Sequence, residues 1–243
     1  KIENILIAGC GTGREPISYS KILNDCDITA IDLSKTSLSY AIRKSVEFDE
    51  NKINFLNGDL LDLSNLNKKF DFVVSSGVLH HMKDPEEGLR ELIEVTNPKG
   101  ILKISLYSKL ARKNLSYFQK TAKKINSDNL KTIRNFRSKI INQKDRDICN
   151  LLSLSDFYSL SEFRDLIFHK MEHQFNITQL EKIISKYNLR FIGFQNINNL
   201  HLKFVNFFKT DKYLYSLEHW NIFEKKFPNS FSTMYQMWLQ KNN

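Results

Sequence analysis

Three glycines alternate with other residues in one short stretch near the start of the chain, Gly9-Cys10-Gly11-Thr12-Gly13, between an apolar run and a helical pattern. Glycines at this spacing let the backbone bend sharply and let a ligand lie against main-chain N–H groups at a helix N-terminus. The dinucleotide pattern G-x-G-x-x-G requires glycine at position 14, where this chain has Arg14. The spacing therefore disfavours a nicotinamide dinucleotide, and a structural turn stays open as the alternative.

Two carboxylates follow the next apolar runs. Asp32 ends the second run, nineteen residues after the last glycine, and a carboxylate there can accept both hydroxyls of a ribose. Its alternative role is a helix N-cap, because Ser34 and a lysine follow. Asp59, within 57–60 (Asn-Gly-Asp-Leu), could accept the amino group of adenine, although Gly-Asp alone is a common turn. Because the loop and Asp32 occur together, we favour a site for an adenosine.

Histidines supply the candidate proton acceptors. His80 and His81 follow the fourth apolar run, at the carboxyl edge where open α/β sheets bind ligands, and imidazole is suited to take a proton near neutral pH. Both are therefore predicted catalytic residues, with packing on a ligand or helix capping as the alternative. Asp165, His169 and His173 are spaced by four, which would align them on a helix face and suit a metal ion. A polar face toward solvent or an acceptor cavity is the favoured interpretation, and no metal is predicted.

The elements that must position these residues alternate in type over the first hundred residues. The apolar runs predict strands at residues 5–8, 28–31, 53–56, 70–75 and 101–107, with helices at 14–23, 35–48 and 85–96. Asp84 is suited to cap the last of these helices and Pro85 to begin it. This alternation predicts βαβ units and a mostly parallel sheet.

After residue 107 the pattern is helical until a strand at 189–194, and a closing antiparallel strand is predicted at 234–239. Capping-box spacing predicts helix starts at Ser159 and Thr178. We therefore expect an α/β fold with seven strands and a large helical insertion before the last two. The predicted domains are a core at 1–108, a helical insertion or lid at 109–186, and the remaining core strands with C-terminal helices at 187–243.

Composition places the chain among globular proteins. It has 243 residues, of which 41% are hydrophobic, and no apolar run long enough to cross a membrane. The three cysteines are widely spaced, which predicts reduced thiols and a cytoplasmic protein. The chain starts at Lys1 and enters a strand within four residues, so we expect a further segment to precede it. The oligomeric state is not predicted.

The formal net charge of +9 is concentrated in one stretch. Residues 109–146 hold twelve Lys or Arg against two Asp, and the rest of the chain is close to neutral. Such a stretch could contact phosphates, but solvated helix faces are the more common reason for a charge run. We therefore expect solvated helices and keep a nucleic-acid partner as the alternative.

Four motifs in order carry a family resemblance: Ile-Ala-Gly-Cys-Gly-Thr-Gly (7–13), Ala-Ile-Asp-Leu-Ser (30–34), Asn-Gly-Asp-Leu (57–60) and Phe-Asp-Phe-Val-Val-Ser-Ser-Gly-Val-Leu-His-His-Met (70–82). The stretch 5–107 resembles the Rossmann-like core of class I S-adenosylmethionine-dependent methyltransferases. Together, order and spacing are far more specific than any one motif. One departure is Ile7, where many members carry an acid.

The resemblance implies a cofactor site for S-adenosyl-L-methionine. In it Gly9, Gly11 and Gly13 would hold the methionine part, Asp32 the ribose, Asp59 with Leu60 the adenine, and Ser76, Gly77 and Val78 the reactive side, with Ala8, Cys10, Thr12, Leu33 and Ser37 completing the set. Later motifs, including Asp156-Phe-Tyr-Ser and Glu172-His, are similar to those of bacterial methyltransferases often fused to tetratricopeptide repeats.

The acceptor pocket implied by the resemblance consists of His81, Tyr107, Tyr158, Arg164, His169 and His173, a set suited to a polar or anionic acceptor. We expect direct in-line transfer of a methyl group to a small molecule or metabolite. An RNA or protein methyltransferase that uses the basic stretch is the alternative, and a cofactor-binding module without turnover is a third hypothesis.

Overall fold

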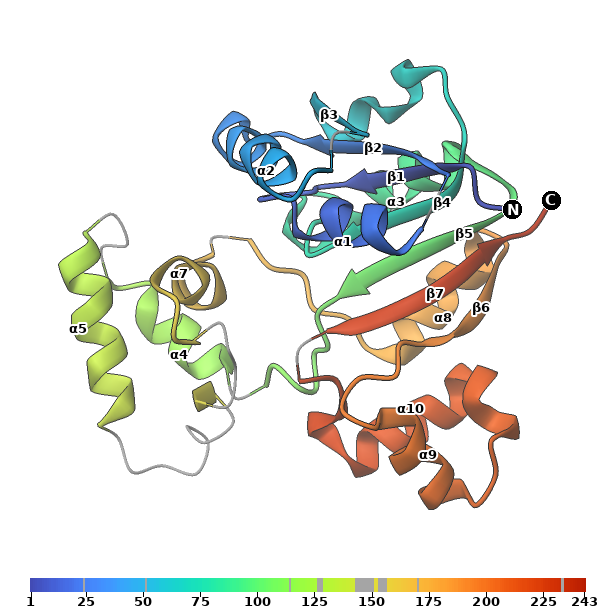
Figure 1. Cartoon of the computed structure of the whole chain (residues 1–243). Coiled ribbons are helices and arrows are strands. Elements are labelled where there is room, and N and C mark those ends of the chain that lie inside the picture. Colours follow the sequence, from blue (N-terminus) through green and yellow to red (C-terminus); the bar gives the residue numbers. More distant parts are fainter. Residues whose placement is uncertain are drawn as a thin grey trace.

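The computed structural model describes residues 1–23, 25–50, 52–113, 115–125, 129–142, 151–152, 157–169, 171–232 and 234–243. Figure 1 shows a twisted sheet with helices on both faces and a separate group of helices beyond one end of it. Among the described residues, no helix is long and apolar enough to span a bilayer.

The sheet has seven strands in the order β3-β2-β1-β4-β5-β7-β6. In chain order the strands are β1 (Asn4–Ala8), β2 (Asp27–Asp32), β3 (Ile53–Asn57), β4 (Phe70–Ser76), β5 (Thr96–Leu106), β6 (Leu189–Phe194) and β7 (Tyr235–Lys241). The first five are parallel, whereas β7 runs antiparallel to both β5 and β6. This confirms the predicted α/β class, the seven strands and the insertion before the last two.

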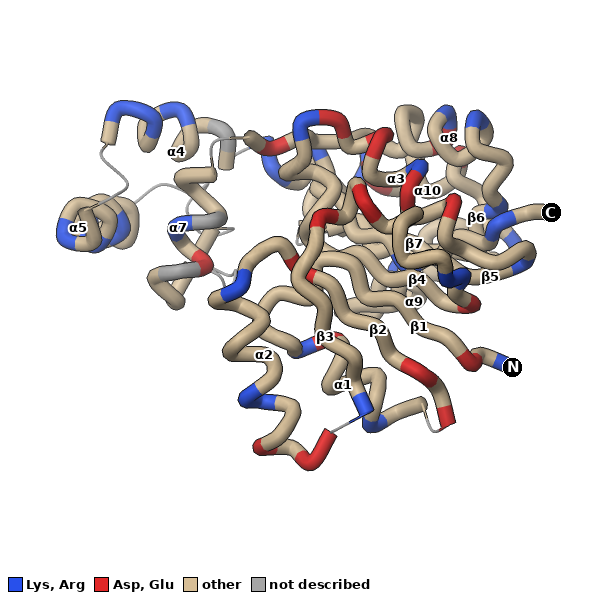
Figure 2. The backbone as a smooth tube through the Cα atoms, turned by 90° about the horizontal axis from the view of Figure 1, so that it is seen from above, with Lys and Arg blue, Asp and Glu red and all other residues tan. Residues whose placement is uncertain are grey.

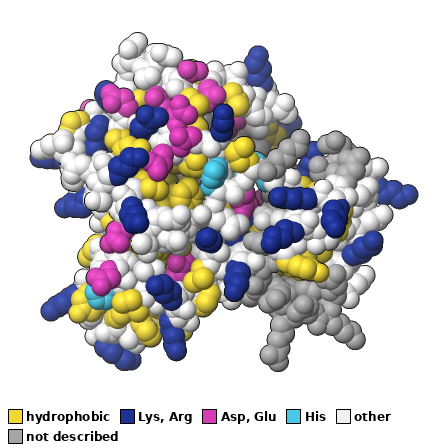
Figure 3. Space-filling view, turned by 180° about the vertical axis from the view of Figure 1, so that it is seen from behind, with side chains coloured by type: hydrophobic (Ala, Val, Ile, Leu, Met, Phe, Trp, Pro, Cys, Tyr) yellow, Lys and Arg dark blue, Asp and Glu magenta, His cyan; other side chains and the backbone are white. Residues whose placement is uncertain are grey.

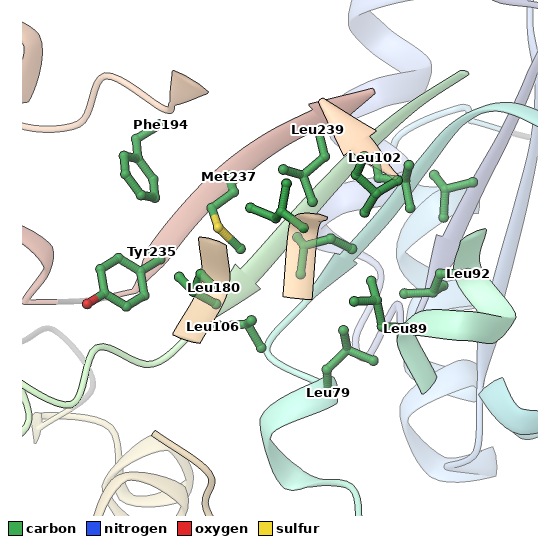
Figure 4. Close-up of a cluster of buried hydrophobic side chains, with 14 of the residues drawn as sticks. Leu79, Leu89, Leu92, Leu102, Leu106, Leu180, Phe194, Tyr235, Met237 and Leu239 are labelled. Carbon is green, nitrogen blue, oxygen red and sulfur yellow. The ribbon is translucent and has the colours of Figure 1, made fainter. Parts of the chain in front are cut away.

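Helices cover both faces because the central strands are apolar on both sides, as buried parallel strands require. On one face α1 (Arg14–Ile22) and α2 (Lys35–Glu47) contribute Ile17 and Leu38 to a cluster with β1, β2 and β4. The other face is covered by α3 (Pro85–Glu94), α8 (Ile177–Lys186), α9 (Leu200–Phe208) and α10 (Leu217–Lys226). Figure 4 shows this second cluster, in which Leu89, Leu180 and Met237 come from different elements.

Two predicted boundaries are wrong. The helix predicted to reach Thr96 ends at Glu94, and Thr96 already pairs with Phe70 as the first residue of β5. The predicted capping box at Thr178 lies two residues too late, because Asn176 caps α8 and shares reciprocal hydrogen bonds with Gln179. Amide side chains form this motif as well as Ser and Glu do. The predicted caps at Asp84 and Ser159 are confirmed.

The insertion forms its own hydrophobic cluster. Helices α4 (Leu115–Ala122), α5 (Leu130–Ile141) and α7 (Leu160–Phe168) bury Phe118, Phe136 and Phe163 against one another. By contrast, the buried residues of α8 pack in the cluster of the sheet. Helices α4, α5 and α7 therefore pack as one lobe, which stands beyond the carboxyl end of β5 (Figure 1).

Candidate functional site

The glycine loop connects β1 to α1 through three residues of positive φ. Gly9, Gly11 and Gly13 have φ of 78°, 53° and 88°, and Gly13 is the N-cap of α1. A side chain is strained in this region, so the loop requires glycine for its backbone conformation. At Gly13 a Cβ atom would also lie 2.7 Å from the Cβ of Ala41 in α2. The glycines therefore permit the turn itself, and Gly13 also permits the close approach of the loop to α2.

Most N–H groups of this loop donate within the protein. Those of Gly9 and Cys10 donate to the Ile31 carbonyl at 2.8 and 3.0 Å, and that of Gly13 donates to Cys10. The Gly11 N–H donates to Oδ2 of Asp32 at 2.7 Å. The loop is thus fixed against the end of β2. Because most of its N–H groups already donate within the protein, the loop accommodates a ligand mainly by its lack of side chains.

Replacing Gly9 by alanine is expected to lower the free energy of unfolding by about 2–4 kcal/mol, because strain at positive φ is joined by overpacking. Its Cβ would lie 2.1 Å from Cγ2 of Val78, a β-branched side chain with little freedom to move. Gly77→Ala is the matched control, since Gly77 has the same φ of 78° and no atom within 4 Å of the added Cβ. Urea unfolding measures both, and equal losses would contradict the role of Val78.

A cavity of about 670 Å³ lies at the carboxyl ends of β1, β2 and β4. Its wall includes Gly9, Asp32, Leu33, Asp59, Leu60, Gly77, Val78, His81 and His169 from the predicted set, together with Ile31, Ser34, Gly58, Leu61, Met82 and Lys83. Residues more than a hundred positions apart therefore meet in one hollow. Its volume is within the range of pockets that hold a small cofactor.

Asp32 and Asp59 stand on the wall of this cavity with fixed side chains. Asp32 accepts from the Ser34 N–H at 2.8 Å through the oxygen that Gly11 does not use. Asp59 caps the short helix Leu60–Leu66 by accepting from the Leu61 N–H. Each oxygen has a second lone pair, so both carboxylates keep acceptor capacity toward a ligand.

Several predicted cofactor residues are not part of the cavity wall. These are Ala8 and Cys10, which are buried, Gly11, Thr12 and Gly13 in the loop, Ser37 in α2, and Ser76 at the end of β4. Burial and the nearby Asp32 raise the pKa of the Cys10 thiol to about 12, so it stays protonated. The Ser37 hydroxyl bonds to that of Ser34.

The predictions did not include a polar cluster beside the loop. Glu15 in α1 accepts from the Ser76 hydroxyl at 3.0 Å and from Nζ of Lys103 at 3.3 Å. Lys103 is 7% exposed and lies near the hydroxyl of Tyr19. The signal in the sequence was a lysine between the apolar residues Leu102 and Ile104 of a predicted strand, since buried lysines are rare without a partner. The cluster joins α1 to β4 and β5 directly under the loop.

Aromatic rings gather at the carboxyl ends of β4 and β5. His80 is fully buried, its ring centroid is 3.8 Å from that of Tyr107, and neither ring nitrogen makes a hydrogen bond with the described residues. Burial lowers the pKa of His80 from 6.5 to about 2, and His81, Arg112 and His169 act in the same direction. His80 is therefore neutral at physiological pH.

His80 makes the stability of the fold depend on pH. The pKa of His80 is lowered in the folded state. Below about pH 6.5 the unfolded chain therefore binds a proton that the folded protein does not bind, and the stability of the fold decreases as the pH is lowered. Between pH 7 and pH 5 the loss from this group is about 2 kcal/mol. His80→Asn removes the group, so its urea unfolding energy should fall by that much less than that of the natural chain. Parallel pH curves for the two proteins would contradict this prediction.

His81 and His169 join the cofactor cavity to the insertion. Their rings stack at 3.6 Å between centroids, and Nδ1 of each lies within 3.0 Å of the Met171 carbonyl. Because a carbonyl only accepts, Nδ1 of His81 carries the proton, and in the neutral ring Nε2 carries the lone pair. The main chain of the insertion also contacts this region, since the His173 N–H donates to the His80 carbonyl at 2.8 Å.

A buried ion pair lies behind the rings. Arg112 and Glu172 are 3.4 Å apart, with side chains 5% and 7% exposed. The guanidinium stacks on the Tyr107 ring at 3.2 Å, and Gln119 and Gln174 donate to the Glu172 carboxylate. The pair therefore connects the beginning of the insertion to its end. Composition alone did not mark either residue.

The structure separates part of the predicted acceptor set. Helix α7 ends at Phe168, and His169 and His173 lie in extended chain, so the prediction of one helix face with Asp165 is wrong. The side chain of Tyr158 is 64% exposed, and its hydroxyl donates to the Leu152 carbonyl within the insertion. Arg164 is also exposed. Only His81, Tyr107, His169 and His173 come together near the cavity.

No group of three or more His, Cys, Asp or Glu side chains among the described residues could hold a metal ion. Cys10 and Cys26 are free thiols. Cys149 and the motif residue Asp156 lie outside the described residues.

Comparison with known proteins gives consistent matches. Residues 6–104 match the family described as methyltransferase domain. An uncharacterised protein of Synechococcus sp. is 28% identical over 201 residues, which cover 79% of this chain and 48% of that protein. The ubiquinone biosynthesis O-methyltransferase of Rickettsia bellii is 31% identical over 101 residues, covering 42% and 40%. The chain thus spans about half the length of these relatives or less.

The structure of PKMT2 from Rickettsia typhi superposes with a TM-score of 0.72 at 19% identity, covering 99% of this chain and 48% of that one. The same protein has been solved with AdoHcy. At this identity the superposition supports the fold, whereas the family match rests on the sequence of residues 6–104. Residues 6–104 therefore match a methyltransferase domain, and they lie in a Rossmann-like α/β fold.

Proposed function

We propose that the protein transfers a methyl group from S-adenosyl-L-methionine to a small-molecule or metabolite acceptor by direct in-line displacement. The observation that carries the proposal is the position of His81. This side chain stands on the wall of the cavity and stacks on His169 from the insertion. A proton acceptor, a cofactor-sized hollow and a covering lobe therefore meet at one edge of the sheet.

The cavity fits the methyl donor. Asp32 would accept the ribose hydroxyls and Asp59 the adenine amino group, with Leu60 against the adenine ring. Gly9, Gly11 and Gly13, with Ala8, Cys10 and Thr12, would shape the bend for the methionine part, and Gly77 and Val78 would lie on the reactive side. Ser76 and Ser37 would support the site indirectly, through their hydrogen bonds with Glu15 and Ser34.

When bound, the sulfonium supplies an electrophilic methyl group, so the chain need only hold the acceptor in line and exclude water. We assign deprotonation of a hydroxyl or ammonium acceptor to Nε2 of His81, because Nδ1 is committed to the Met171 carbonyl. His80 is a poorer base at a pKa of about 2, and we propose that it packs beneath the acceptor with Tyr107.

The contact between the insertion and the cavity favours a small acceptor over a polymer. His169 lies on the cavity wall, and the buried Arg112–Glu172 pair closes the insertion behind Tyr107. The His173 ring presents a buried Nε2 that makes no hydrogen bond with the described residues. Buried donors without partners are costly, so a polar acceptor group that bonds to His173 would be favoured there. We place Tyr158 and Arg164 at the outer rim of this lobe.

The test uses cofactor labelled in the methyl group and a cell extract separated into small-molecule, protein and RNA fractions. The proposal expects label in the small-molecule fraction, and His81→Gln should lower kcat at saturating cofactor by about 100-fold or more. Label only in RNA or protein would favour the alternative acceptors. Absence of transfer into any fraction, despite cofactor binding, would favour a binding module.

The sequence predictions of a cytoplasmic protein and of a resemblance to methyltransferases fused to tetratricopeptide repeats stay predictions.

A further inference from the structure

We propose that the outer face of α4 and α5 binds single-stranded nucleic acid. We call it the basic surface, and it consists of exposed side chains on these helices and on the chain that adjoins α4: Lys109, Lys113, Lys120, Lys123, Lys124, Lys131, Arg134 and Lys139. The inference goes beyond the proposed methyl acceptor and does not depend on it, because it concerns a different surface and is tested by binding alone.

The charge of the basic surface is not compensated by neighbours. The described parts of this stretch, 109–125 and 129–142, contain no Asp or Glu, and none of the eight cations forms an ion pair with the described residues. Elsewhere some exposed lysines are paired, as Lys69 is with Glu94 and Lys186 with Glu86, and others, such as Lys203, form no ion pair with the described residues. Figure 3 shows several blue side chains on the lobe, whereas the magenta ones lie mainly over the rest of the molecule, with blue ones among them. The lobe therefore attracts polyanions selectively.

Helix α5 presents its cations on a rigid support. Ile133, Phe136 and Ile140 are buried in the cluster of the insertion, which turns Lys131, Arg134 and Lys139 outward. Figure 2 shows blue segments along α4 and α5 without red ones. The two ends of α5 expose the apolar residues Leu130 and Ile141. Between these ends, the exposed side chains of α5 are all polar or cationic. A membrane-bound helix would instead expose an apolar face, so the surface fits phosphates better than a bilayer.

An exposed aromatic ring lies among the lysines of α4. Tyr117 is 67% exposed, Lys120 follows at three residues on the same side of the helix, and Lys123 and Lys124 lie in the turn directly after it. Aromatic side chains between cations are the stacking platforms on which unpaired bases lie in single-strand binding proteins. This observation favours a single-stranded nucleic acid over an acidic protein.

The basic surface belongs to the lobe that also reaches the cavity. Arg137 of α5 donates to the Tyr158 carbonyl just before α7, and α7 ends at Phe168, directly before His169 on the cavity wall. A strand bound on α4 and α5 would therefore be held on the same lobe that covers the methyl-transfer edge. Bound strand and acceptor site need not share residues.

The test is fluorescence anisotropy of a labelled 20-nucleotide oligouridine, measured without cofactor over a series of KCl concentrations. We expect binding whose affinity falls steeply with salt, by about 0.7 log units per decade of salt for each phosphate contact. Lys131→Glu/Arg134→Glu/Lys139→Glu should weaken binding by at least about tenfold and flatten the salt dependence. Tyr117→Ala should weaken it by about 5- to 100-fold without changing the salt slope.

The matched control is Lys203→Glu/Lys212→Glu/Lys225→Glu. It changes the net charge by the same amount on exposed residues of α9, of the short helix Lys212–Tyr215 and of α10. It should retain most of the affinity. Equal losses in the two triple variants would overturn the proposal, as would absence of binding in 50 mM KCl. Stronger binding to polyglutamate or to phosphatidylglycerol vesicles than to oligouridine would overturn it in favour of an acidic protein or a membrane. Tyr117→Ala keeps the test decisive if the triple variant does not fold.

Discussion

Glu172→Gln is expected to lower the free energy of unfolding by about 3–5 kcal/mol, because it removes the carboxylate of a buried ion pair. The Arg112 guanidinium would stay buried against the Tyr107 ring, where water cannot replace the lost carboxylate. The hydrogen bonds from Gln119 and Gln174 would also be weakened. Urea unfolding at pH 7 measures the loss.

The control for this substitution is Glu86→Gln, which breaks the pair between Glu86 and Lys186. Those side chains are 38% and 60% exposed, so screening by water limits the loss to about 1 kcal/mol or less. If Glu172→Gln cost no more than the control, the pair between the two ends of the insertion would not hold the lobe in place.

Asp32→Asn is expected to weaken binding of S-adenosylhomocysteine by about 10- to 150-fold, because hydrogen bonds to a charged group contribute about 1.5–3 kcal/mol. Asparagine retains one acceptor oxygen, so its amide nitrogen must face the N–H of either Gly11 or Ser34. The substitution therefore disturbs the glycine loop as well as the ribose contact. Calorimetric titration of the folded variant measures the affinity.

Asp59→Asn serves as the comparison for Asp32. The Asp59 side chain accepts from the Leu61 N–H and not from the glycine loop. The variant should therefore lose affinity without altering that loop. We expect a loss of about tenfold. Unchanged affinity in Asp32→Asn would mean that the carboxylate serves only to hold the loop, and the assignment of the ribose contact would fail.

The sequence predicted the sheet closely because its strands are continuous apolar runs. The run from Ile5 and that from Phe70 both lie in the centre of the sheet, where burial on two faces demands such residues. The strand at 189–194 was predicted with its observed bounds. The cavity wall was predictable for a related reason, since residues that directly follow parallel strands must meet at one edge.

The acceptor side was less predictable because it depends on contacts between distant segments. Spacing placed His169 and His173 on a helix that ends before both of them. Burial decides that His80 is neutral while His81 faces the cavity, and adjacent histidines carry no sequence signal for that difference. The pair of Arg112 and Glu172 forms only when the two ends of the insertion meet, sixty residues apart.

The place of β7 in the sheet affects how the protein can be made. This strand lies between β5 and β6 and, in the part of the chain that the structure describes, it is the only strand that β6 pairs with. Until residues 235–241 have left the ribosome, β5 and β6 each present an unpaired edge, and such edges invite association with other nascent chains. Completion of the sheet is therefore a late event of synthesis, although the glycine loop and its strands emerge first.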